Sequence, residues 1–323
     1  MSDDARKTLV KMLQRAVQKD ASDLILKTGK PPYFRVDGDV DSQDLPALKG
    51  EEVEAIVLSM LGEDQMRYFQ KQGEIDLAFT EKGVGRFRVN IFRQRGSISI
   101  VMRRIKTKIL NIDQLNLPPQ VQRFAEFRRG LALVTGTTGS GKSTALAAIL
   151  DIINTNRKCH IVTIEDPIEF LHPDKKAVVN QREIAIDTKD FSSALKSVMR
   201  QDPDVIMVGE MRDITTFQAA ISASETGHLV FSTLHTSNAM QTIDRIIDLF
   251  PPEQHAQVRS QLSMNLMGIL CLRLILRADG VGRVPACELV FTNGSVRTLI
   301  RDNRIAQIPM AIQQGADDGM ISF

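Results

Sequence analysis

Few cysteines and little net charge mark this 323-residue sequence, and each scarcity excludes a class of protein. The three cysteines, Cys159, Cys271 and Cys287, are widely spaced and form no C-x-x-C pair. We therefore expect neither a disulfide framework nor a zinc site, and a reducing cytoplasm suits this cysteine usage. Lysine plus arginine exceed aspartate plus glutamate by 41 − 39 = 2, so the overall charge does not indicate nucleic acid or an anionic membrane as a partner.

Long hydrophobic runs are also missing. The first ten residues, MSDDARKTLV, contain no apolar signal core. The most apolar later stretch, Leu266 to Leu276, is short and contains Arg273, so we expect no segment to cross a bilayer. These absences predict a soluble cytosolic protein that reaches a membrane only through its partners.

The strongest positive signal is the stretch LALVTGTTGSGKST, residues 131–144. An apolar run before the glycines is typical of a buried strand, and the residues after them are typical of a helix. In this context the pattern G-x-x-x-x-G-K-[ST] predicts a P-loop rather than a glycine-rich turn with a chance lysine. Loop N–H groups and the helix N-terminus would hold phosphate, Lys142 would reach the β- and γ-phosphates, and Ser143 would offer its hydroxyl to Mg²⁺. The predicted nucleotide-binding residues are Thr137, Thr138, Gly139, Ser140, Gly141, Lys142, Ser143 and Thr144.

The order of predicted elements divides the chain into two parts. Residues 1–107 mix helices with strands in a pattern that indicates a small α+β domain with an antiparallel sheet. Residues 108–118 are the predicted linker. Residues 119–323 alternate strand and helix as far as residue 233, which indicates an α/β fold with a mostly parallel sheet. From about residue 253 the pattern is mainly helical, with a candidate hairpin at 280–289.

Two strands of this second part end in acidic residues. Glu165 ends the strand at 160–165 and Glu169 follows it, and Glu210 follows the strand at 204–209. In α/β sheets, ligands bind at the carboxyl ends of the strands. Glu210 would hold Mg²⁺ directly or through its water, and Glu169 or Glu165 would orient or deprotonate a water molecule. The alternative for each acid is a helix N-cap or a solvated loop charge.

Two histidines, His228 and His235, flank the apolar strand that follows. Seven residues apart on an extended segment, they point to different faces, so we do not expect them to share a metal. They are either structural, or they sense the γ-phosphate from positions beside the nucleotide. The residues alone leave both interpretations open.

A basic stretch lies near the end of the first part. Along the strand at 86–95, arginines alternate with apolar residues, among them Phe87. The arginines could form a solvated face, or they could reach a nucleotide held by a neighbouring subunit as arginine fingers. A nucleic-acid surface would need exposed aromatic residues, whereas Phe87 and Phe92 resemble core residues. The basic residues are Arg86, Arg88, Arg93, Arg95, Arg103, Arg104, Lys106 and Lys108, with no acid among them.

Four motifs in the same order resemble those of the secretion ATPases of type IV pili and type II secretion. They are the P-loop GTTGSGKST, the acid box TIEDPIEF, the strand DVIMVGEMRD and the histidine segment TGHLVFSTLHT. The segments GRFRVNIF and MRQDPD agree with this likeness. Over nearly its whole length the chain resembles the pilus retraction ATPases (PilT-like), and we expect neither the leading domain nor the four-cysteine zinc motif of the pilus-extension and type II secretion ATPases.

The resemblance implies a PAS-like N-terminal domain and a RecA-like P-loop domain with a helical C-terminal part. It also implies a homohexameric, cytoplasmic ring with ATP and Mg²⁺ bound between the two domains. Hydrolysis would drive pilus retraction and twitching motility through an inner-membrane platform protein, with a paralogous motor ATPase as a further candidate partner. By the same resemblance Glu169 is the catalytic carboxylate and Glu210 the Walker B acid. His228 and His235 form the histidine box, and the best finger candidates are Arg88 and Arg103, followed by Arg86 and Arg93.

Three features depart from that family. Ile25 in ASDLILK replaces a histidine, the segment SVRTLIRD at 295–302 differs from the motif AIRNLIRE linked with retraction, and the chain ends earlier than is usual, so a final helical region is expected to be missing. Alternative interpretations are therefore a truncated chain, an accessory retraction paralogue, or a pilus-extension or type II secretion ATPase. From other classes, the alternatives are a nucleotide-switched assembly subunit that does not hydrolyse ATP and a nucleic-acid translocase.

Overall fold

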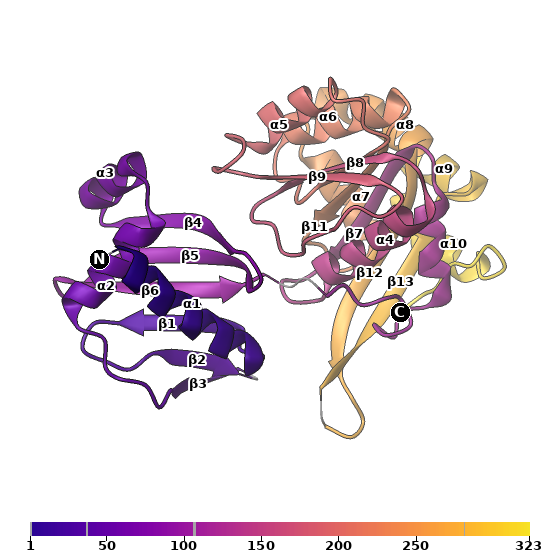
Figure 1. The fold of residues 1–323 in the computed structure, drawn as a ribbon. Coiled ribbons are helices and arrows are strands. Elements are labelled where there is room, and N and C mark those ends of the chain that lie inside the picture. Colours follow the sequence, from indigo (N-terminus) through magenta and orange to yellow (C-terminus); the bar gives the residue numbers. More distant parts are fainter. Residues whose placement is uncertain (1, 37, 106–107, 281) are drawn as a thin grey trace. The chain divides into compact units, whose positions relative to one another are not determined.

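The computed structural model describes residues 2–36, 38–105, 108–280 and 282–323, and the chain folds into two compact units (Figure 1). The first unit runs from Met1 to Thr107 and the second from Lys108 to Phe323. Each has a hydrophobic core of its own. Lys106 of the basic stretch lies outside the described residues.

The first unit is built on a six-stranded antiparallel sheet with strand order β3-β2-β1-β6-β5-β4. The apolar side of α1 supplies Leu9, Met12 and Leu13 to the core, where α2 and the sheet complete the packing. The predicted α+β domain with an antiparallel sheet is confirmed, although α3 was not predicted. The elements are α1 (Ser2–Gln18), β1 (Asp23–Lys27), β2 (Tyr33–Val36), β3 (Asp39–Ser42), α2 (Gly50–Met60), α3 (Glu63–Gln72), β4 (Glu74–Glu81), β5 (Gly85–Gln94) and β6 (Ser97–Arg104).

The two faces of this sheet differ in character. Along β5, Phe87, Val89 and Ile91 are buried in the core, whereas Arg88 is exposed, so the predicted alternation is confirmed. On the polar face, Arg88 pairs in register with Arg103 of β6, and Arg103 pairs with Asp23 of β1. Arg88 and Arg103 therefore form a short arginine row across β5 and β6.

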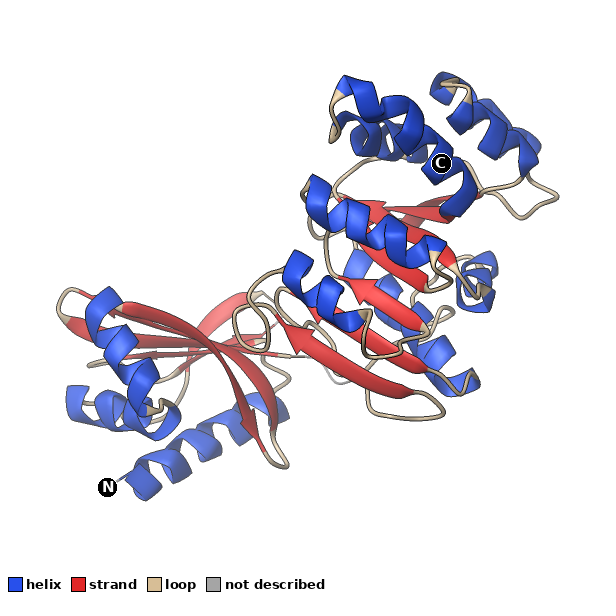
Figure 2. Cartoon of the chain, turned by 90° about the horizontal axis from the view of Figure 1, so that it is seen from above, coloured by secondary structure: helices blue, strands red, loops and turns tan. Residues whose placement is uncertain are grey.

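The second unit is built on a seven-stranded sheet with order β13-β12-β7-β11-β10-β8-β9. All neighbours are parallel except β12 and β13. Every residue of β7, β10 and β11 is buried, which requires cover on both faces, and helices pack on either side of the strands (Figure 2). The predicted α/β fold is confirmed. The strands are β7 (Gly130–Gly136), β8 (His160–Glu165), β9 (Val178–Glu183), β10 (Val205–Val208), β11 (Leu229–Leu234), β12 (Leu266–Leu276) and β13 (Arg283–Phe291).

The helices of this unit follow the alternating pattern as far as α6. The α-helices are α4 (Lys142–Asn156), α5 (Phe191–Val198), α6 (Ile214–Glu225), α7 (Ala239–Asp248), α8 (His255–Asn265), α9 (Gly294–Arg301) and α10 (Ile308–Gln314). Short 3₁₀ helices are η1 (Pro119–Glu126), η2 (Pro252–Gln254) and η3 (Ile305–Gln307).

The mainly helical prediction for the region after residue 253 is wrong in one part. Leu266–Leu276 forms β12, which pairs in parallel with β7 and continues the sheet, and β13 returns beside it. The cause of the error is physical, because a short apolar run in the middle of a sheet lacks the period that separates a strand from a buried helix. The candidate hairpin at 280–289 is therefore the end of a longer one.

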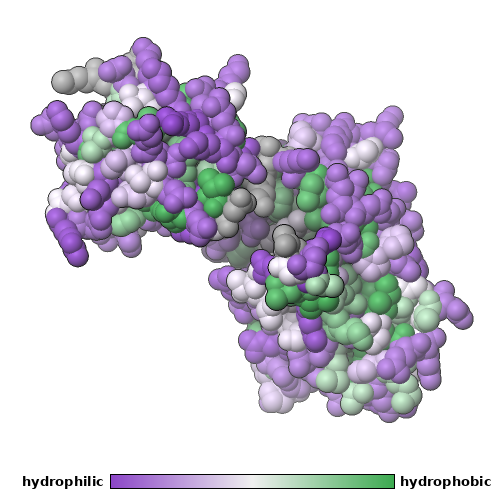
Figure 3. Space-filling model, turned by 90° about the horizontal axis from the view of Figure 1, so that it is seen from below, coloured by the Kyte–Doolittle hydropathy of each residue, from purple (hydrophilic) through white to green (hydrophobic). Residues whose placement is uncertain are grey.

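The described helices are too short or too polar for any of them to span a membrane. Hydrophilic side chains cover much of both units on the face drawn in Figure 3.

Candidate functional site

The P-loop connects the end of β7 to the start of α4 and depends on its glycines. A Cβ atom on Gly136, whose φ is +148°, would overlap the hydroxyl of Ser140 and the carbonyl oxygen of Leu272. Gly139 and Gly141 also have positive φ angles, +75° and +92°, in the region where other residues are strained. The loop can take this conformation only because these positions are glycine.

The side chains of the loop divide into an exposed rim and a buried lysine. Thr137, Thr138 and Gly139 are exposed, whereas Lys142 is only 7 % exposed. The Lys142 ammonium donates to the carbonyl oxygens of Gly136 and Thr137, at 2.9 and 3.0 Å. Burial lowers the pKa of Lys142, and the negative charges of Glu210 and Glu169 partly offset that effect. Ser143 and Thr144, at the start of α4, are half-buried.

One histidine, His235, lies between Lys142 and Glu210, the acid that follows β10. Nδ1 of His235 lies 3.5 Å from Nζ of Lys142, and Nε2 of His235 lies 3.4 Å from Oε1 of Glu210. A lysine ammonium can only donate, so Nδ1 acts as an acceptor and Nε2 carries the proton towards Glu210. The second carboxylate oxygen of Glu210 binds Arg212 at 2.8 Å.

Glu210 is placed by the backbone at the end of β10. The N–H of Gly209 donates to the carbonyl oxygen of Ile164 at 2.8 Å, and the hydroxyl of Thr233 donates to the carbonyl oxygen of Gly209 at 2.6 Å. These contacts connect β8, β10 and β11 at their carboxyl ends. Glu210 therefore lies at the edge of the sheet that also carries the P-loop.

The two carboxylates of the acid box differ in environment. Glu165 is 7 % exposed and accepts hydrogen bonds from the Thr163 hydroxyl at 2.7 Å and the Gln181 amide at 2.9 Å. Burial raises the pKa of Glu165 to about 6. Glu169 is exposed, and its charge acts on Lys142. Of the two, Glu169 is the carboxylate that a water molecule or phosphate can reach.

His228 lies at the other end of β11. Its Nδ1 lies 3.0 Å from the carbonyl oxygen of Ala223 and 3.1 Å from the hydroxyl of Thr226. Because Leu229 pairs with Gly130 at the start of β7, the length of the strand puts His228 roughly 20 Å from the P-loop of its own chain. The structure therefore brings His235 to the P-loop and leaves His228 away from it.

The two finger candidates belong to the first unit. Arg88 and Arg103 are cross-strand neighbours with exposed side chains. Nε of Arg103 donates to Asp23 at 2.8 Å, and Asp23, only 4 % exposed, also lies 3.4 Å from Nε of Arg35. Nε of Arg88 lies 3.9 Å from Asp76. Asp23 thus holds Arg103 by one nitrogen, whereas the guanidinium end faces solvent.

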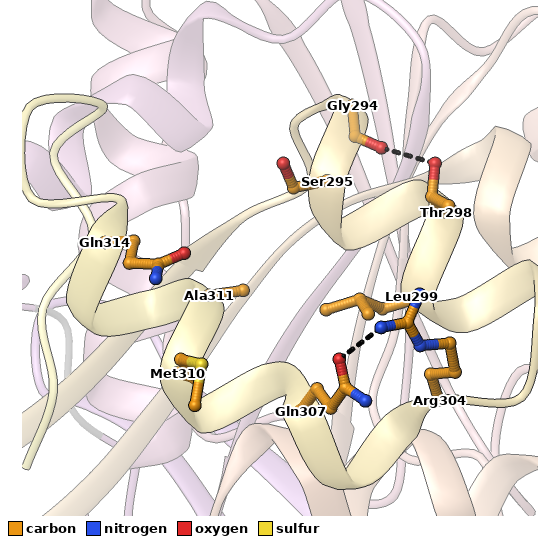
Figure 4. Close-up of a pocket in the computed structure, with 9 residues that line it drawn as sticks. All are labelled: Gly294, Ser295, Thr298, Leu299, Arg304, Gln307, Met310, Ala311 and Gln314. Carbon is orange, nitrogen blue, oxygen red and sulfur yellow. Dashed lines mark hydrogen bonds between the residues drawn. The ribbon is translucent and has the colours of Figure 1, made fainter.

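A separate groove of about 410 Å³ lies between α9 and α10 (Figure 4). Among its lining residues, Thr298 donates to the carbonyl oxygen of Gly294 within α9, and Arg304 donates to the side-chain oxygen of Gln307. Among the described residues that line it there is no carboxylate and no histidine. The groove lacks the chemistry for hydrolysis, and it includes part of the segment SVRTLIRD.

Residues that the sequence reasoning missed also shape the site. Gln181, Thr163 and Thr233 position the acids, and Arg212 neutralises Glu210. Arg212 could have been found from its place two residues after Glu210. Gln181 belongs to β9, which was not predicted, and its contacts are with residues well before it in the chain.

Comparison with known proteins gives consistent matches. The family model described as "Type II/IV secretion system protein" matches residues 2–315. The chain is 47 % identical to the type IV pilus retractation ATPase PilT of Pseudomonas aeruginosa, over 97 % of this chain and 90 % of that protein. It is 40 % identical to the type IV pilus ATPase PilU of the same organism, over 97 % of this chain and 82 % of that protein. A crystal structure of the pilus retraction motor PilT with bound ADP superposes with a TM-score of 0.88 at 43 % identity, covering 97 % of this chain and 94 % of that one.

Proposed function

Because the chain belongs to the type II/IV secretion system protein family, we propose that it is a motor ATPase that hydrolyses ATP to drive type IV pilus retraction. Support comes from the likeness to PilT over nearly the full length of both chains, and from the structure of PilT that holds ADP. Identity to the PilT of Pseudomonas aeruginosa exceeds identity to its PilU, which favours the retraction motor over an accessory paralogue.

One observation favours ATP hydrolysis over nucleotide binding alone. His235 contacts both the P-loop lysine and Glu210, and the charge of Glu169 acts on the same lysine. A loop that only binds phosphate has no need of two acids at the carboxyl edge of its sheet. A site that positions water and metal beside the γ-phosphate does need them.

In this site the loop residues bind the phosphates of ATP. The N–H groups of residues 137–144 would face the phosphate oxygens, and Lys142 would exchange its two carbonyl partners for the β- and γ-phosphates. Glycine at 136 fits this role, because a Cβ there would overlap the Ser140 hydroxyl and the Leu272 carbonyl and displace the loop. Ser143, directly, and Glu210, through water, would hold Mg²⁺, which neutralises developing phosphate charge.

Glu169 is the proposed base. Water attacks the γ-phosphorus, its oxygen forms the new P–O bond, and the bond to the bridging oxygen of ADP breaks. The proton that the water loses passes to the Glu169 carboxylate and then to phosphate. His235 would couple the position of Glu210 to the presence of the γ-phosphate, because it contacts both Lys142 and Glu210.

The working protein would be a homohexameric ring. Its units would be a PAS-like domain (1–107) and a RecA-like ATPase domain (119–323), joined by the linker 108–118. Arg88 or Arg103 would serve as an arginine finger, with Asp23 limiting the freedom of Arg103. The ring would act from the cytoplasm on an inner-membrane platform protein, and a PilU-like paralogue is a candidate partner.

The direct test compares the wild-type chain with Lys142→Ala. Phosphate release with Mg²⁺ and an ATP concentration series should show saturable turnover for the wild type and none for the variant, with weakened nucleotide binding. Wild-type turnover in Lys142→Ala would contradict the proposal. Saturable ATP binding without phosphate release in the wild type would instead favour the nucleotide-switched assembly subunit.

A further inference from the structure

Gln181 makes hydrogen bonds to two parts of the loop that carries Glu169. We call residues 165–172 the acid loop. The side-chain amide of Gln181 donates to Glu165 Oε1 and to the carbonyl oxygen of Phe170, both at 2.9 Å. Its oxygen accepts from the N–H of His172, also at 2.9 Å. One side chain on β9 therefore contacts the beginning and the end of the acid loop.

The middle of the loop is fixed through the same contacts. The Glu165 carboxylate, which Gln181 binds, lies near the backbone of Glu169, whose influence lowers the pKa of Glu165 against the larger effect of burial. Ile168 and Phe170, on either side of Glu169, are buried at 2 % and 8 % exposure. Glu169 itself is exposed. The loop therefore presents one carboxylate to solvent on a backbone that is held from both sides.

We propose that Gln181 is a positioning residue for Glu169, and that Glu165 acts as an anchor of the acid loop and not as the base. The inference rests on the proposed ATPase function and adds to it how the water-activating carboxylate is placed. Gln181 touches neither phosphate nor water in this account. It acts by keeping the backbone of residues 165–172 in one conformation.

The chemistry of the contacts explains why this position needs an amide. Gln181 uses two donor hydrogens and one acceptor oxygen, and among side chains of this length only glutamine offers both kinds of group in one plane. Leucine of similar size would keep the packing and lose all three bonds. Glutamate would place a second carboxylate beside Glu165.

The first test is Gln181→Leu, with Asn180→Ala as matched control. Asn180 is exposed and precedes Gln181 in β9. The nitrogen of its side-chain amide lies 2.8 Å from Nε2 of His160, which is not part of the acid loop. Gln181→Leu should lower kcat by about 10- to 100-fold, as small misplacements of catalytic groups do, with ATP affinity within about 2-fold of wild type. Asn180→Ala should have the kcat and the ATP affinity of the wild type. Equal kcat in Gln181→Leu and wild type would overturn the inference.

The second test separates positioning from a general structural role. If Gln181 acts only through Glu169, the double variant Gln181→Leu with Glu169→Gln should be no slower than Glu169→Gln alone. A further loss of 10-fold or more in the double variant would contradict positioning through Glu169.

A third readout does not depend on turnover. Hydrogen exchange of the full chain should be faster at the amides of 165–172 in Gln181→Leu than in the wild type, and unchanged there in Asn180→Ala. If the wild-type chain released no phosphate, the proposed ATPase function would be rejected. Hydrogen exchange would still show whether Gln181 holds the backbone of the acid loop. Unchanged exchange at residues 165–172 in Gln181→Leu would overturn the inference even in an active ATPase.

Discussion

Nε2 of His235 lies 3.4 Å from a carboxylate oxygen of Glu210, and the other ring nitrogen faces the P-loop lysine. A single ring therefore connects Lys142, the proposed phosphate-binding lysine, to Glu210, the proposed metal-binding acid. We expect His235→Ala to lower kcat by about 10- to 100-fold, because Lys142 and Glu210 lose their common partner, and to change ATP affinity less. His255, whose Nε2 contacts the carbonyl oxygen of Phe250, is the control for histidine removal. Equal losses in His255→Ala and His235→Ala would argue against a specific role.

The P-loop glycines should differ in how well they tolerate alanine. Gly136→Ala meets the Ser140 hydroxyl and the Leu272 carbonyl, so something in the loop must move, and ATP binding should be lost. At Gly139 an added Cβ meets no described atom within 4 Å, and only the positive φ opposes it, at roughly 1–2 kcal/mol. Calorimetric titration with ATP would compare the two variants. Equal affinity in Gly136→Ala and Gly139→Ala would contradict the packing described for the loop.

Burial of Glu165 predicts a pH dependence of stability. Its pKa is raised from 4.5 to about 6 in the folded chain, so the folded state binds this proton more tightly than the unfolded state. Protonation of Glu165 therefore adds about 2 kcal/mol to the free energy of unfolding below pH 4.5, and this contribution is lost as the pH rises through 6. Glu165→Gln removes it. Relative to this variant, the wild type should gain stability in chemical denaturation as the pH falls from 7.5 to 5. Parallel pH profiles for the two proteins would disagree with a buried, titrating Glu165.

The arginine row gives a prediction for the assembled enzyme. If Arg103 or Arg88 stabilises the transition state as a finger, its replacement by alanine should lower kcat by about 10³-fold or more. Asp23→Asn should lower kcat less, because it loosens Arg103 without removing it. Arg67, exposed and paired with Asp64 on α3, is the control. Phosphate release from the assembled protein is the measurement, and unaffected turnover in both Arg103→Ala and Arg88→Ala would reject the finger role.

The parts of the site that could be predicted from the sequence are those with short-range signals. The P-loop has fixed spacing between glycines and lysine, and it lies between an apolar strand and a helix, so one stretch contains the whole pattern. Glu210 could be placed for the same reason, since it directly follows a buried strand. The alternation along β5 likewise needed only neighbouring residues.

What the sequence did not reveal depends on contacts between distant segments. β12 is a strand because it lies beside β7, and its apolar residues alone do not distinguish it from a buried helix. Gln181 contacts the acid loop across the pairing of β8 and β9, which the polar sequence of β9 does not signal. The separation of His228 from His235 follows from strand length, but only once both ends of β11 are known. A buried Glu165 beside an exposed Glu169 is likewise a product of packing.

The most direct test of the account is turnover and ATP binding in Glu169→Gln. With Mg²⁺ and saturating ATP, the wild type should release phosphate. The variant should bind ATP with near wild-type affinity and be slower by about 10²-fold or more, because only the proton acceptor is lost. Wild-type phosphate release by Glu169→Gln would contradict the assignment of the base, and with it the hydrolytic site described around Lys142.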